Sequence, residues 1–514
     1  MKKYFVGIVS FLLLFQLSGC IGEIPSTGKT DHISIALPQD IIGFYPWVKS
    51  YEIYTVLVNR NIYNSLVEFD EIFRINPCLA KSWNNPDDYT WRFFLQENVT
   101  FHNGYAFTSE DVKYTIDSIR ENTSEDNQLK ELLKLIEEVK IIDKYTIEIK
   151  TIKPCSILLN LLTDIFIVSK QYQEDTQTQH PIGTGAYQIV NYSRNDYIKL
   201  QRYDDYWKKD LPEVKYATFK IIRSYENNTK ALLNHTVDIA EIVQKYLTNN
   251  DSVDYSIMKV DNPTVAYLSF DFRERNNITG YNEKNPFADL RVRKAIYYAI
   301  NISEMLKNST ARSPASQLVI PLIFGYNPEI QRLACNITAA RQLMNESGYT
   351  NGFTVVFDYS SDVFDQKTIE FIKNQLSKIN INLTLNACSY DSYILKLFTH
   401  NVSFYINAWT TGTGDSGEIY DYLIGTKNEE QDIGSFNAGL YSNSMVDRLG
   451  ENASISMVPY GRLNSLQECF KIAMDDVAWI PLFTWKTTYG INNQFLWTPR
   501  ADQQILIEYI KRNT

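Results

Sequence analysis

Alternation of apolar and polar residues predicts strands in several parts of the chain. The segment HISIALPQ, residues 32–39, alternates with a period of two, as a half-buried strand does. Residues 141–150, IIDKYTIEIK, have the pattern of a hairpin, and a second strand-rich stretch covers residues 187–222. INLTLNA, residues 381–387, predicts a further strand. Strands are therefore expected along most of the chain.

Apolar residues at helical spacing occur between these strands. They recur within residues 129–139, within residues 289–300, where Asp289 can cap the helix, and within residues 369–379. Another helix is expected from Thr338 as its N-cap to Gly348 as its stop signal. Helices and strands are mixed throughout, so the predicted fold class is α/β with mixed α+β character. The sequence contains no internal repeat and no long low-complexity linker.

Composition and charge narrow the function classes. At about 150 residues per domain, 514 residues predict two or three domains. Hydrophobic residues make up 44%, enough for a large core, which excludes a disordered chain. The net charge of −10 disfavours nucleic acid or an anionic membrane surface as a partner. Aromatic residues reach 13%, which suits either core packing or ligand-binding walls.

The first thirty residues predict export and anchoring. Two lysines precede the apolar stretch YFVGIVSFLLLFQL, which is too short to span a bilayer comfortably. Leu17-Ser18-Gly19-Cys20 resembles the lipobox of prokaryotic lipoproteins. We therefore expect a signal peptide at residues 1–19, a lipid on Cys20 and a tether at residues 20–30. The resemblance implies a protein anchored to the cell membrane on its extracytoplasmic face.

Cysteine and histidine spacing gives no sign of a metal centre. The chain has six Cys and five His, and none form a CxxC motif or a His pair at ligand spacing. If Cys20 carries a lipid, five Cys remain, so at least one is unpaired. A disulfide is possible in this compartment, but buried thiols are favoured. No metal and no cofactor are expected.

Five motif-like stretches occur in order along the chain. They are NPCLAKSW (76–83) leading into YTWRFFLQENVTFHNGYAFTSEDVKYTI (89–116), PIGTGAYQI (181–189) with DDYW (204–207), PFADLRVRKAIYYAIN (286–301), ITAARQLMNESGY (337–349) and WIPLF (479–483). Together they resemble the family 5 extracellular solute-binding proteins of ABC importers, which include oligopeptide-, dipeptide- and nickel-binding lipoproteins. They cover nearly all of the chain after the signal peptide. These motifs report the fold and are not themselves binding sites.

The resemblance implies a periplasmic-binding-protein-like fold of two lobes joined by two crossing strands. The crossing strands are expected at YLSFDF, residues 267–272, and at WIPLF. Lobe I would be discontinuous, with a first part at residues 31–269 and a return segment at 483–514, and lobe II would comprise residues 270–482. A monomer without enzymatic activity is expected, which binds a peptide or other small solute in the cleft and delivers it to the permease subunits of an ABC transporter.

The stretch NAWTTGTGDSGEIYDYLI, residues 407–424, is expected to form the cleft loop of lobe II. By the resemblance, Trp409 is an aromatic wall of the ligand site. Peptide-binding members commonly have an Asp three residues after that Trp, which pairs with the α-amino group of the ligand, whereas this chain has Gly412. Asp415 is the candidate partner for a cationic group of the ligand. An Asx-type turn in a Gly-rich loop is an equal interpretation of Asp415.

The same stretch contains three motifs of other function classes. Residues 412–417 match GxGxxG, with Asp432 twenty residues on, but a nicotinamide cofactor is unexpected on an exported lipoprotein. Residues 414–417 are the GDSG of serine proteases, without a His in a recognisable catalytic setting. Asp415 and Glu418 form a candidate carboxylate pair for an exported hydrolase, although acidic residues at a helix start are more often caps.

On the lobe I side, Tyr45 and Trp47 in IIGFYPW are candidate ligand walls, and core packing is an equal interpretation.

The favoured hypothesis is a membrane-tethered receptor for a peptide-like ligand. Uptake of nickel or another metal chelate is the alternative, because nickel binders of the family can hold a metal complex with few protein ligands.

Overall fold

The computed structural model describes most of the chain after the N-terminal segment. The described residues are 31–47, 53–122, 128–171, 181–243, 254–274 and 284–513. The expected signal peptide, Cys20 and the tether therefore lie outside the described residues. Within the described part, no helix has the length and apolar character needed to cross a membrane.

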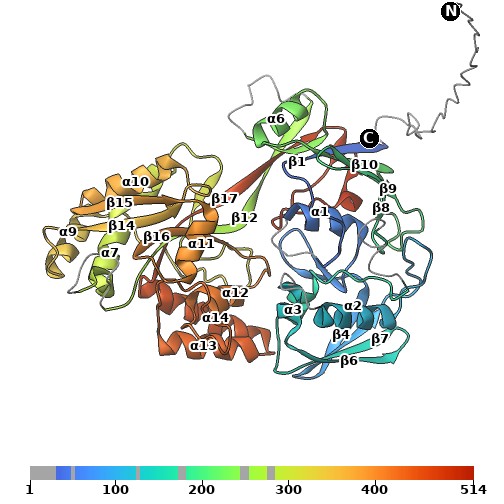
Figure 1. The fold of residues 1–514 in the computed structure, drawn as a ribbon, viewed down its shortest axis with the longest axis horizontal. Coiled ribbons are helices and arrows are strands. Elements are labelled where there is room, and N and C mark those ends of the chain that lie inside the picture. The colour runs from blue at the N-terminus through green and yellow to red at the C-terminus, as the bar shows by residue number, and fades with distance from the viewer. Residues whose placement is uncertain are drawn as a thin grey trace, which may run out of the picture.

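Two long strands connect two bodies of mixed helix and sheet. β12 (Tyr255–Phe270) and β17 (Trp479–Asn492) pair antiparallel along their whole length and run from one body to the other (Figure 1). We call the body built before β12, together with the residues after β17, lobe I, and the body between the two strands lobe II. The family-type two-lobe arrangement expected from the sequence is confirmed.

Lobe I contains two larger sheets and the helices that cover them. The first sheet carries β8 (Tyr187–Ser193), β9 (Tyr197–Arg202), β10 (Tyr216–Ile221), β1 (His32–Leu37) and β11 (Ile239–Glu241), beside α1 (Ile53–Ile62), α4 (Leu158–Leu162) and α6 (Tyr225–Leu233). The second carries β4 (Ala80–Asp87), β5 (Thr90–Leu95), β7 (Thr146–Thr151) and β6 (Ile136–Asp143), with α2 (Ser109–Glu121) and α3 (Gln128–Leu133). Short elements complete the lobe: β2 (Val67–Phe69), β3 (Ile75–Pro77), β18 (Phe495–Leu496), η4 (Ile507–Tyr509) and β19 (Lys511–Arg512).

Lobe II extends the first sheet on the other side of the crossing strands. Its strands are β13 (Arg312–Pro314), β14 (Phe353–Ser360), β15 (Ile381–Cys388) and β16 (Phe404–Thr410). Its helices are η2 (Pro286–Ala288), α7 (Leu290–Ala299), α8 (Ile302–Met305), α9 (Ile337–Glu346), α10 (Gln366–Ser377), α11 (Tyr390–Phe398), α12 (Gly417–Ile419), η3 (Tyr420–Ile424), α13 (Ser444–Ile455) and α14 (Pro459–Asp475). One sheet thus runs through both lobes, in the order β15-β14-β16-β12-β17-β11-β1-β10-β9-β8.

Each face of this sheet buries apolar residues because strand side chains alternate between the faces. In lobe II, Phe404 and Ile406 of β16 pack into one core, and Tyr405 packs into the core on the other face. Lobe I has its own large core, which includes Ile33 and Ile35 of β1. Many aromatic residues pack in such cores. The rings of Phe270 and Phe404 are stacked, and their centroids lie 5.2 and 5.4 Å from the ring centroid of Phe287.

Two details of the helix predictions are wrong, and one is confirmed. Asp289 caps α7 by accepting from the N–H of Arg291. The N-cap of α9 is Asn336, whose side chain accepts from Ala339, and not Thr338. The expected helix at residues 129–139 ends at Leu133, a turn follows at residues 134–135, and β6 begins at Ile136. A register shift in β6 after Ile136 turns residues three apart to one face, which imitates helical spacing.

The lobe boundaries at 31–269, 270–482 and 483–514 stay predictions. Both crossing strands continue well beyond the two expected segments, since β12 begins at Tyr255 and β17 ends at Asn492. From Thr264 onward β12 pairs with β16 of lobe II, and a register shift between Asp261 and Val265 precedes this pairing. The change from lobe I to lobe II neighbours therefore falls within β12 itself.

Candidate functional site

The loop between β16 and α12, residues 411–416, is organised around the carboxylate of Glu418. This carboxylate accepts from the indole N–H of Trp409 at 3.0 Å and from the backbone N–H groups of Gly412 at 3.1 Å and Thr413 at 3.0 Å. The Thr413 hydroxyl donates to it at 2.8 Å. Burial raises the pKa of Glu418, and these hydrogen bonds oppose the shift. Glu418 therefore fixes both the loop and the ring of Trp409.

Trp409 is held at the end of β16 by contacts on several sides. Its ring lies 5.6 Å from that of Tyr422 and 5.0 Å from that of Phe436, between centroids. Its Cα partner across the sheet is Val265 of the crossing strand β12. The side chain is half-buried, so part of an aromatic surface stays available. Its role as a wall of the ligand site stays a prediction.

The Asp415 carboxylate is already paired within lobe II. Arg462 of α14 donates to it through Nη2 at 2.7 Å and through Nε at 3.3 Å, and both side chains are buried. The backbone N–H of Gly417 donates to Asp415 Oδ1 at 2.7 Å, which is the Asx-type turn that the sequence offered as the second interpretation. Contact of Asp415 with a ligand stays a prediction, but the structure gives this carboxylate a cation from its own chain.

The hydrogen bonds of Glu418 and Asp415 involve residues of the three motifs of other function classes in residues 407–424. The N–H groups of Gly412 and Thr413, with which a GxGxxG loop would bind a phosphate, donate to Glu418. Ser416 of the GDSG sequence is fully buried behind Gly325, where an added Cβ would lie 1.8 Å from its hydroxyl oxygen. The carboxylates of the candidate hydrolase pair, Asp415 and Glu418, are both engaged by donors of the same lobe.

Tyr45 and Trp47 lie together in lobe I, with ring centroids 5.3 Å apart. Trp47 is only 7% exposed, belongs to the lobe I core, and donates through Nε1 to the backbone oxygen of Phe166 at 3.4 Å. Tyr45 is half-buried against the same core. Trp47 thus has the surroundings expected from core packing, and Tyr45 keeps the greater exposure. A ligand contact of either residue stays a prediction.

The two lobes meet directly at the tip of the loop 411–416. Asn160 of α4 in lobe I donates through Nδ2 to the backbone oxygen of Thr413 at 2.7 Å. Gly414 has φ +69°, and a Cβ added there would lie 3.1 Å from Phe73 of lobe I. Phe69 and Phe73 pack into a lobe II core, so the contact is apolar as well as polar. The crossing strands and this loop therefore both join the lobes.

Three further acidic or polar residues were missed by the sequence reasoning. Asn160 is a single polar residue within LLNLL, and nothing in that run points to the other lobe. Asp421 of η3 is half-buried near Arg462 and Lys153, and burial raises its pKa to about 6. Glu241 ends β11, and burial raises its pKa to about 7. The sequence did contain a signal for Glu241. It lies two residues after the core residue Ile239 in the same strand, so both side chains point to the same face of the sheet.

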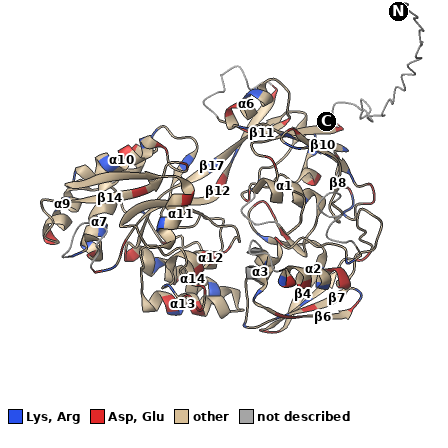
Figure 2. Ribbon diagram, in the orientation of Figure 1, with Lys and Arg blue, Asp and Glu red and all other residues tan. Residues whose placement is uncertain are grey.

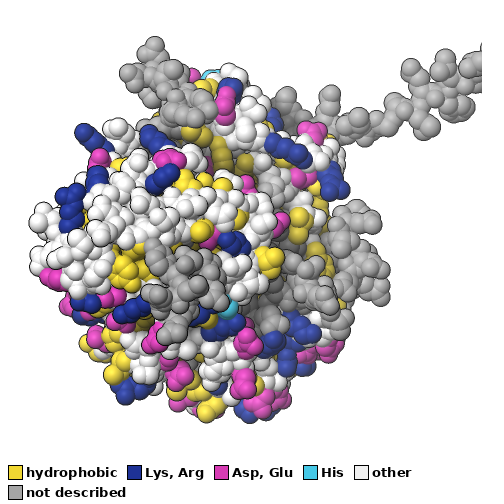
Figure 3. Space-filling model, turned by 60° about the vertical axis from the view of Figure 1, so that its left-hand side comes forward, with side chains coloured by type: hydrophobic (Ala, Val, Ile, Leu, Met, Phe, Trp, Pro, Cys, Tyr) yellow, Lys and Arg dark blue, Asp and Glu magenta, His cyan; other side chains and the backbone are white. Residues whose placement is uncertain are grey.

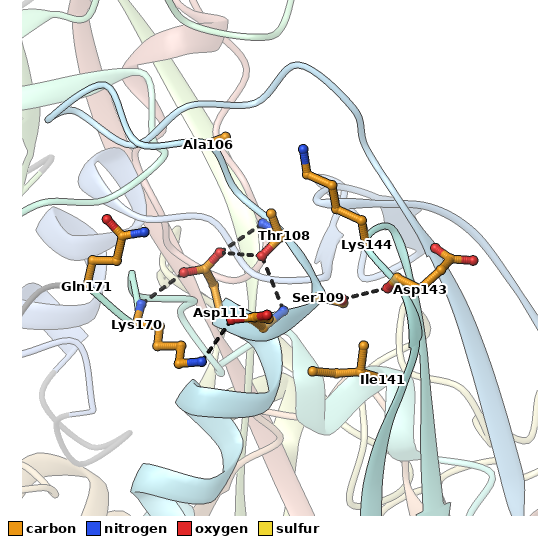
Figure 4. A pocket seen from close by; sticks show the side chains of 10 residues that line it. Ala106, Thr108, Ser109, Asp111, Ile141, Asp143, Lys144, Lys170 and Gln171 are labelled. Atoms are coloured by element: carbon orange, nitrogen blue, oxygen red, sulfur yellow. Dashed lines mark hydrogen bonds and ion pairs between the residues drawn. The ribbon is translucent and has the colours of Figure 1, made fainter.

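A surface hollow of about 470 Å³ lies elsewhere, at the start of α2 in lobe I. Figure 4 shows Asp111 turned toward Thr108 and Lys170. Asp111 and Thr108 form a capping box, the N–H of Lys170 donates to Asp111 at 2.9 Å, and the Lys170 ammonium pairs with Glu110 at 2.8 Å. Thr108, Glu110, Asp111 and Lys170 thus bond among themselves, and the residues that line the hollow all belong to lobe I.

Charge is spread over the molecule without a dominant patch. Acidic and basic residues are interspersed over both lobes (Figure 2), and apolar side chains form small groups between charged ones on the face drawn in Figure 3. No group of three or more His, Cys, Asp or Glu that could hold a metal ion occurs within the described residues. Of the cysteines described, Cys78, Cys155 and Cys469 are buried free thiols.

Comparison with known proteins identifies the relatives of this chain. Residues 74–431 match the bacterial extracellular solute-binding proteins, family 5 (middle). The glutathione-binding protein GsiB of Salmonella paratyphi A is 25% identical over 496 residues, which is 92% of each chain. Among solved structures, HbpA2 of Haemophilus parasuis has a TM-score of 0.81 at 17% identity, covering 94% of this chain and 100% of its own. NikA of Brucella suis, in complex with Fe(III)-EDTA, has a TM-score of 0.80 at 17% identity with the same coverage.

Proposed function

This chain belongs to the bacterial extracellular solute-binding proteins of family 5, the binding components of ABC importers, and on that premise we propose that it captures a peptide-like solute between its lobes and delivers it to the importer's permease. The observation that carries the proposal is the pair of junctions between the lobes. The crossing strands β12 and β17 join the lobes at one place, and Asn160 meets Thr413 at another. A solute held between these junctions contacts both lobes only when they are closed.

Half-buried aromatic and polar groups near the second junction suit a peptide. Trp409 offers part of its ring, and its orientation is fixed by Glu418. A rigid ring of this kind loses little conformational entropy on binding and packs against ligand side chains. The similarity to GsiB, which is named for binding glutathione, itself a peptide, supports a peptide-like solute for this chain.

Small-angle scattering tests the proposal. The full chain, purified in mild detergent, is measured with and without a mixture of di- to pentapeptides. We expect the radius of gyration to fall when peptide is added, and a single binding isotherm by calorimetry. An unchanged radius of gyration together with no heat of binding for any peptide pool would contradict the proposal.

A metal chelate is the second candidate solute. The Brucella suis protein NikA has a similar fold and was solved with Fe(III)-EDTA. A chelate brings its own metal ligands, so uptake of one does not require a cluster of metal-ligating side chains, and none occurs within the described residues. Calorimetry with nickel plus histidine, against nickel alone and against peptides, separates the two candidates.

Anchoring by a lipid on Cys20 is part of the same proposal. The charged start, the apolar stretch and Leu17-Ser18-Gly19-Cys20 support cleavage before Cys20 and its lipidation. The protein would then act as a monomer on the extracytoplasmic face of the cell membrane. Metabolic labelling with an alkyne fatty acid should mark the wild-type chain but not Cys20→Ala. Equal labelling of both chains would contradict the anchor.

A further inference from the structure

Lobe I and lobe II face one another over a wider surface than a single hydrogen bond. Met457, in the turn between α13 and α14 (labelled in Figure 1), packs against the lobe I core. Lys153, which follows β7 in lobe I, lies near the carboxylate of Asp421 in η3 of lobe II. We call this surface, residues 153–160 of lobe I against residues 411–462 of lobe II, the lobe junction.

The carboxylate of Asp421 sits at the lobe junction without a hydrogen-bond donor. No described residue donates to it, and the side chain is half-buried. Of the two cations that act on it, Arg462 belongs to its own lobe and is already bonded to Asp415 at 2.7 Å. The second cation, Lys153, belongs to lobe I. The cost of keeping a charge on Asp421 therefore depends on where lobe I lies.

The charged groups that act on Asp421 come from both lobes and have both signs. They are Arg462, Lys153, Asp415 and Glu418. Burial raises the pKa of Asp421 from 3.8 to about 6, the two cations oppose this shift, and the two carboxylates add to it. Burial also raises the pKa of Tyr420 beside it and of Cys155 across the lobe junction, so neither of these groups carries a charge near pH 6.

Separating the lobes would expose Asp421 to water. Lys153 and Cys155 leave its surroundings when lobe I moves away, and the pKa of the solvated carboxyl returns toward its ordinary 3.8. A group with a higher pKa in the closed form binds a proton on closing. Closure is therefore favoured below about pH 6, and this advantage is lost as the pH rises through that value.

We propose that Asp421 takes up a proton from the solvent when the lobes close on a solute, so that capture is tighter in an acidic medium than in a neutral one. The proton returns to the solvent when the lobes open to release the solute. This inference rests on the proposed function and adds the regulation of the closing step. The device lies at the lobe junction and does not require a contact between Asp421 and the solute.

Small-angle scattering at pH 5 and pH 7 tests this inference on the full chain in mild detergent. The probe is a mixture of di- to pentapeptides of Ala, Leu, Phe and Ser, whose side chains do not titrate between these pH values. The readout is the peptide concentration that gives half of the compaction. The variant is Asp421→Asn, and the matched control is Asp475→Asn, at an exposed carboxylate at the end of α14 in the same lobe.

The half-compaction concentration should be about 10-fold lower at pH 5 than at pH 7 for the wild type and for Asp475→Asn. Asp421→Asn should give equal concentrations at the two pH values, because an amide does not titrate in this range. A wild type without pH dependence, or an Asp421→Asn variant that keeps it, would overturn the inference and leave the proposed function intact. No compaction at either pH would overturn both.

A substitution in lobe I tests whether the proton uptake depends on the opposite lobe. Lys153→Gln removes a cation that lowers the pKa of Asp421 in the closed form, so the ratio of half-compaction concentrations at pH 7 and pH 5 should increase. Lys81→Gln, at an exposed lysine of lobe I, should keep the wild-type ratio. An unchanged ratio in Lys153→Gln would overturn the inference, because Asp421 would then titrate independently of lobe I.

Discussion

Asn160 and Thr413 join the two lobes by a hydrogen bond of 2.7 Å from the Asn160 side-chain amide to the Thr413 backbone oxygen. The same loop that receives this bond carries Gly414 against Phe73 of lobe I, and its other side is held by Glu418. Glu418 in turn holds Trp409. A single loop thus connects the closing contact between the lobes with the aromatic side chain predicted to meet the ligand.

Replacing Asn160 by Ala should weaken ligand binding without unfolding the protein. The variant loses one neutral hydrogen bond that forms between lobes, which is worth about 0.5–1.5 kcal/mol. We therefore expect a roughly 2- to 10-fold higher Kd and faster dissociation, measured by calorimetry and stopped-flow fluorescence. Asn85→Ala is the matched control, because the exposed Asn85 also donates to a backbone oxygen, that of Thr90 within lobe I. Equal affinities of the two variants would show that the contact has no part in closure.

Glu418→Gln should disorder the loop that positions Trp409. A glutamine offers one acceptor oxygen in place of two, while the N–H groups of Trp409, Gly412 and Thr413 all need an acceptor. We expect a loss of about 1–3 kcal/mol in stability and a red shift of tryptophan emission. Near-ultraviolet circular dichroism and thermal unfolding measure these effects. Glu429→Gln, an exposed carboxylate on the same lobe, should show neither, and an unchanged emission spectrum of Glu418→Gln would contradict the prediction.

Asp415→Asn separates the two interpretations of Asp415. If the Arg462 pair is its main role, the variant leaves a buried guanidinium without its counter-charge and destabilises the ligand-free protein by about 3–5 kcal/mol. The double variant Asp415→Asn, Arg462→Met should recover part of that loss, because the uncompensated charge is gone. Thermal unfolding without ligand gives the measurement. A stable single variant with lost affinity would instead support contact between Asp415 and the ligand.

The fold was largely predictable because family motifs and strand alternation report the same architecture. Asp289 capped its helix as expected, and 141–150 lies within the β6–β7 hairpin. The errors have local physical causes. A register shift after Ile136 gave a strand the spacing of a helix, and Asn336, two residues earlier, took the cap expected at Thr338.

The site was less predictable because its contacts join residues distant in the sequence. Asn160 and Thr413 are 253 positions apart, and Asp415 and Arg462 are 47 apart. No local pattern encodes such pairs, so the sequence did not reveal that Arg462 pairs with Asp415. The indole N–H of Trp47 donates to the backbone oxygen of Phe166, so the side chain can lie in the core with its polar group bonded. The sequence around Trp47 does not reveal this acceptor.

Glu241→Gln should stabilise the ligand-free protein, increasingly so as the pH rises. The folded pKa of Glu241 is raised from 4.5 to about 7, so between these values the unfolded chain releases a proton that the folded chain retains. The contribution of Glu241 to wild-type stability therefore falls from about pH 4.5 to pH 7 and is constant above, and a glutamine has no such loss. The melting-temperature difference, variant minus wild type, should grow from pH 4.5 to pH 8 and reach the equivalent of up to ~3 kcal/mol. Glu97→Gln, at an exposed carboxylate of lobe I, is the matched control. A difference for Glu241→Gln that is flat or falls with pH would mean that burial does not raise the pKa of this carboxylate.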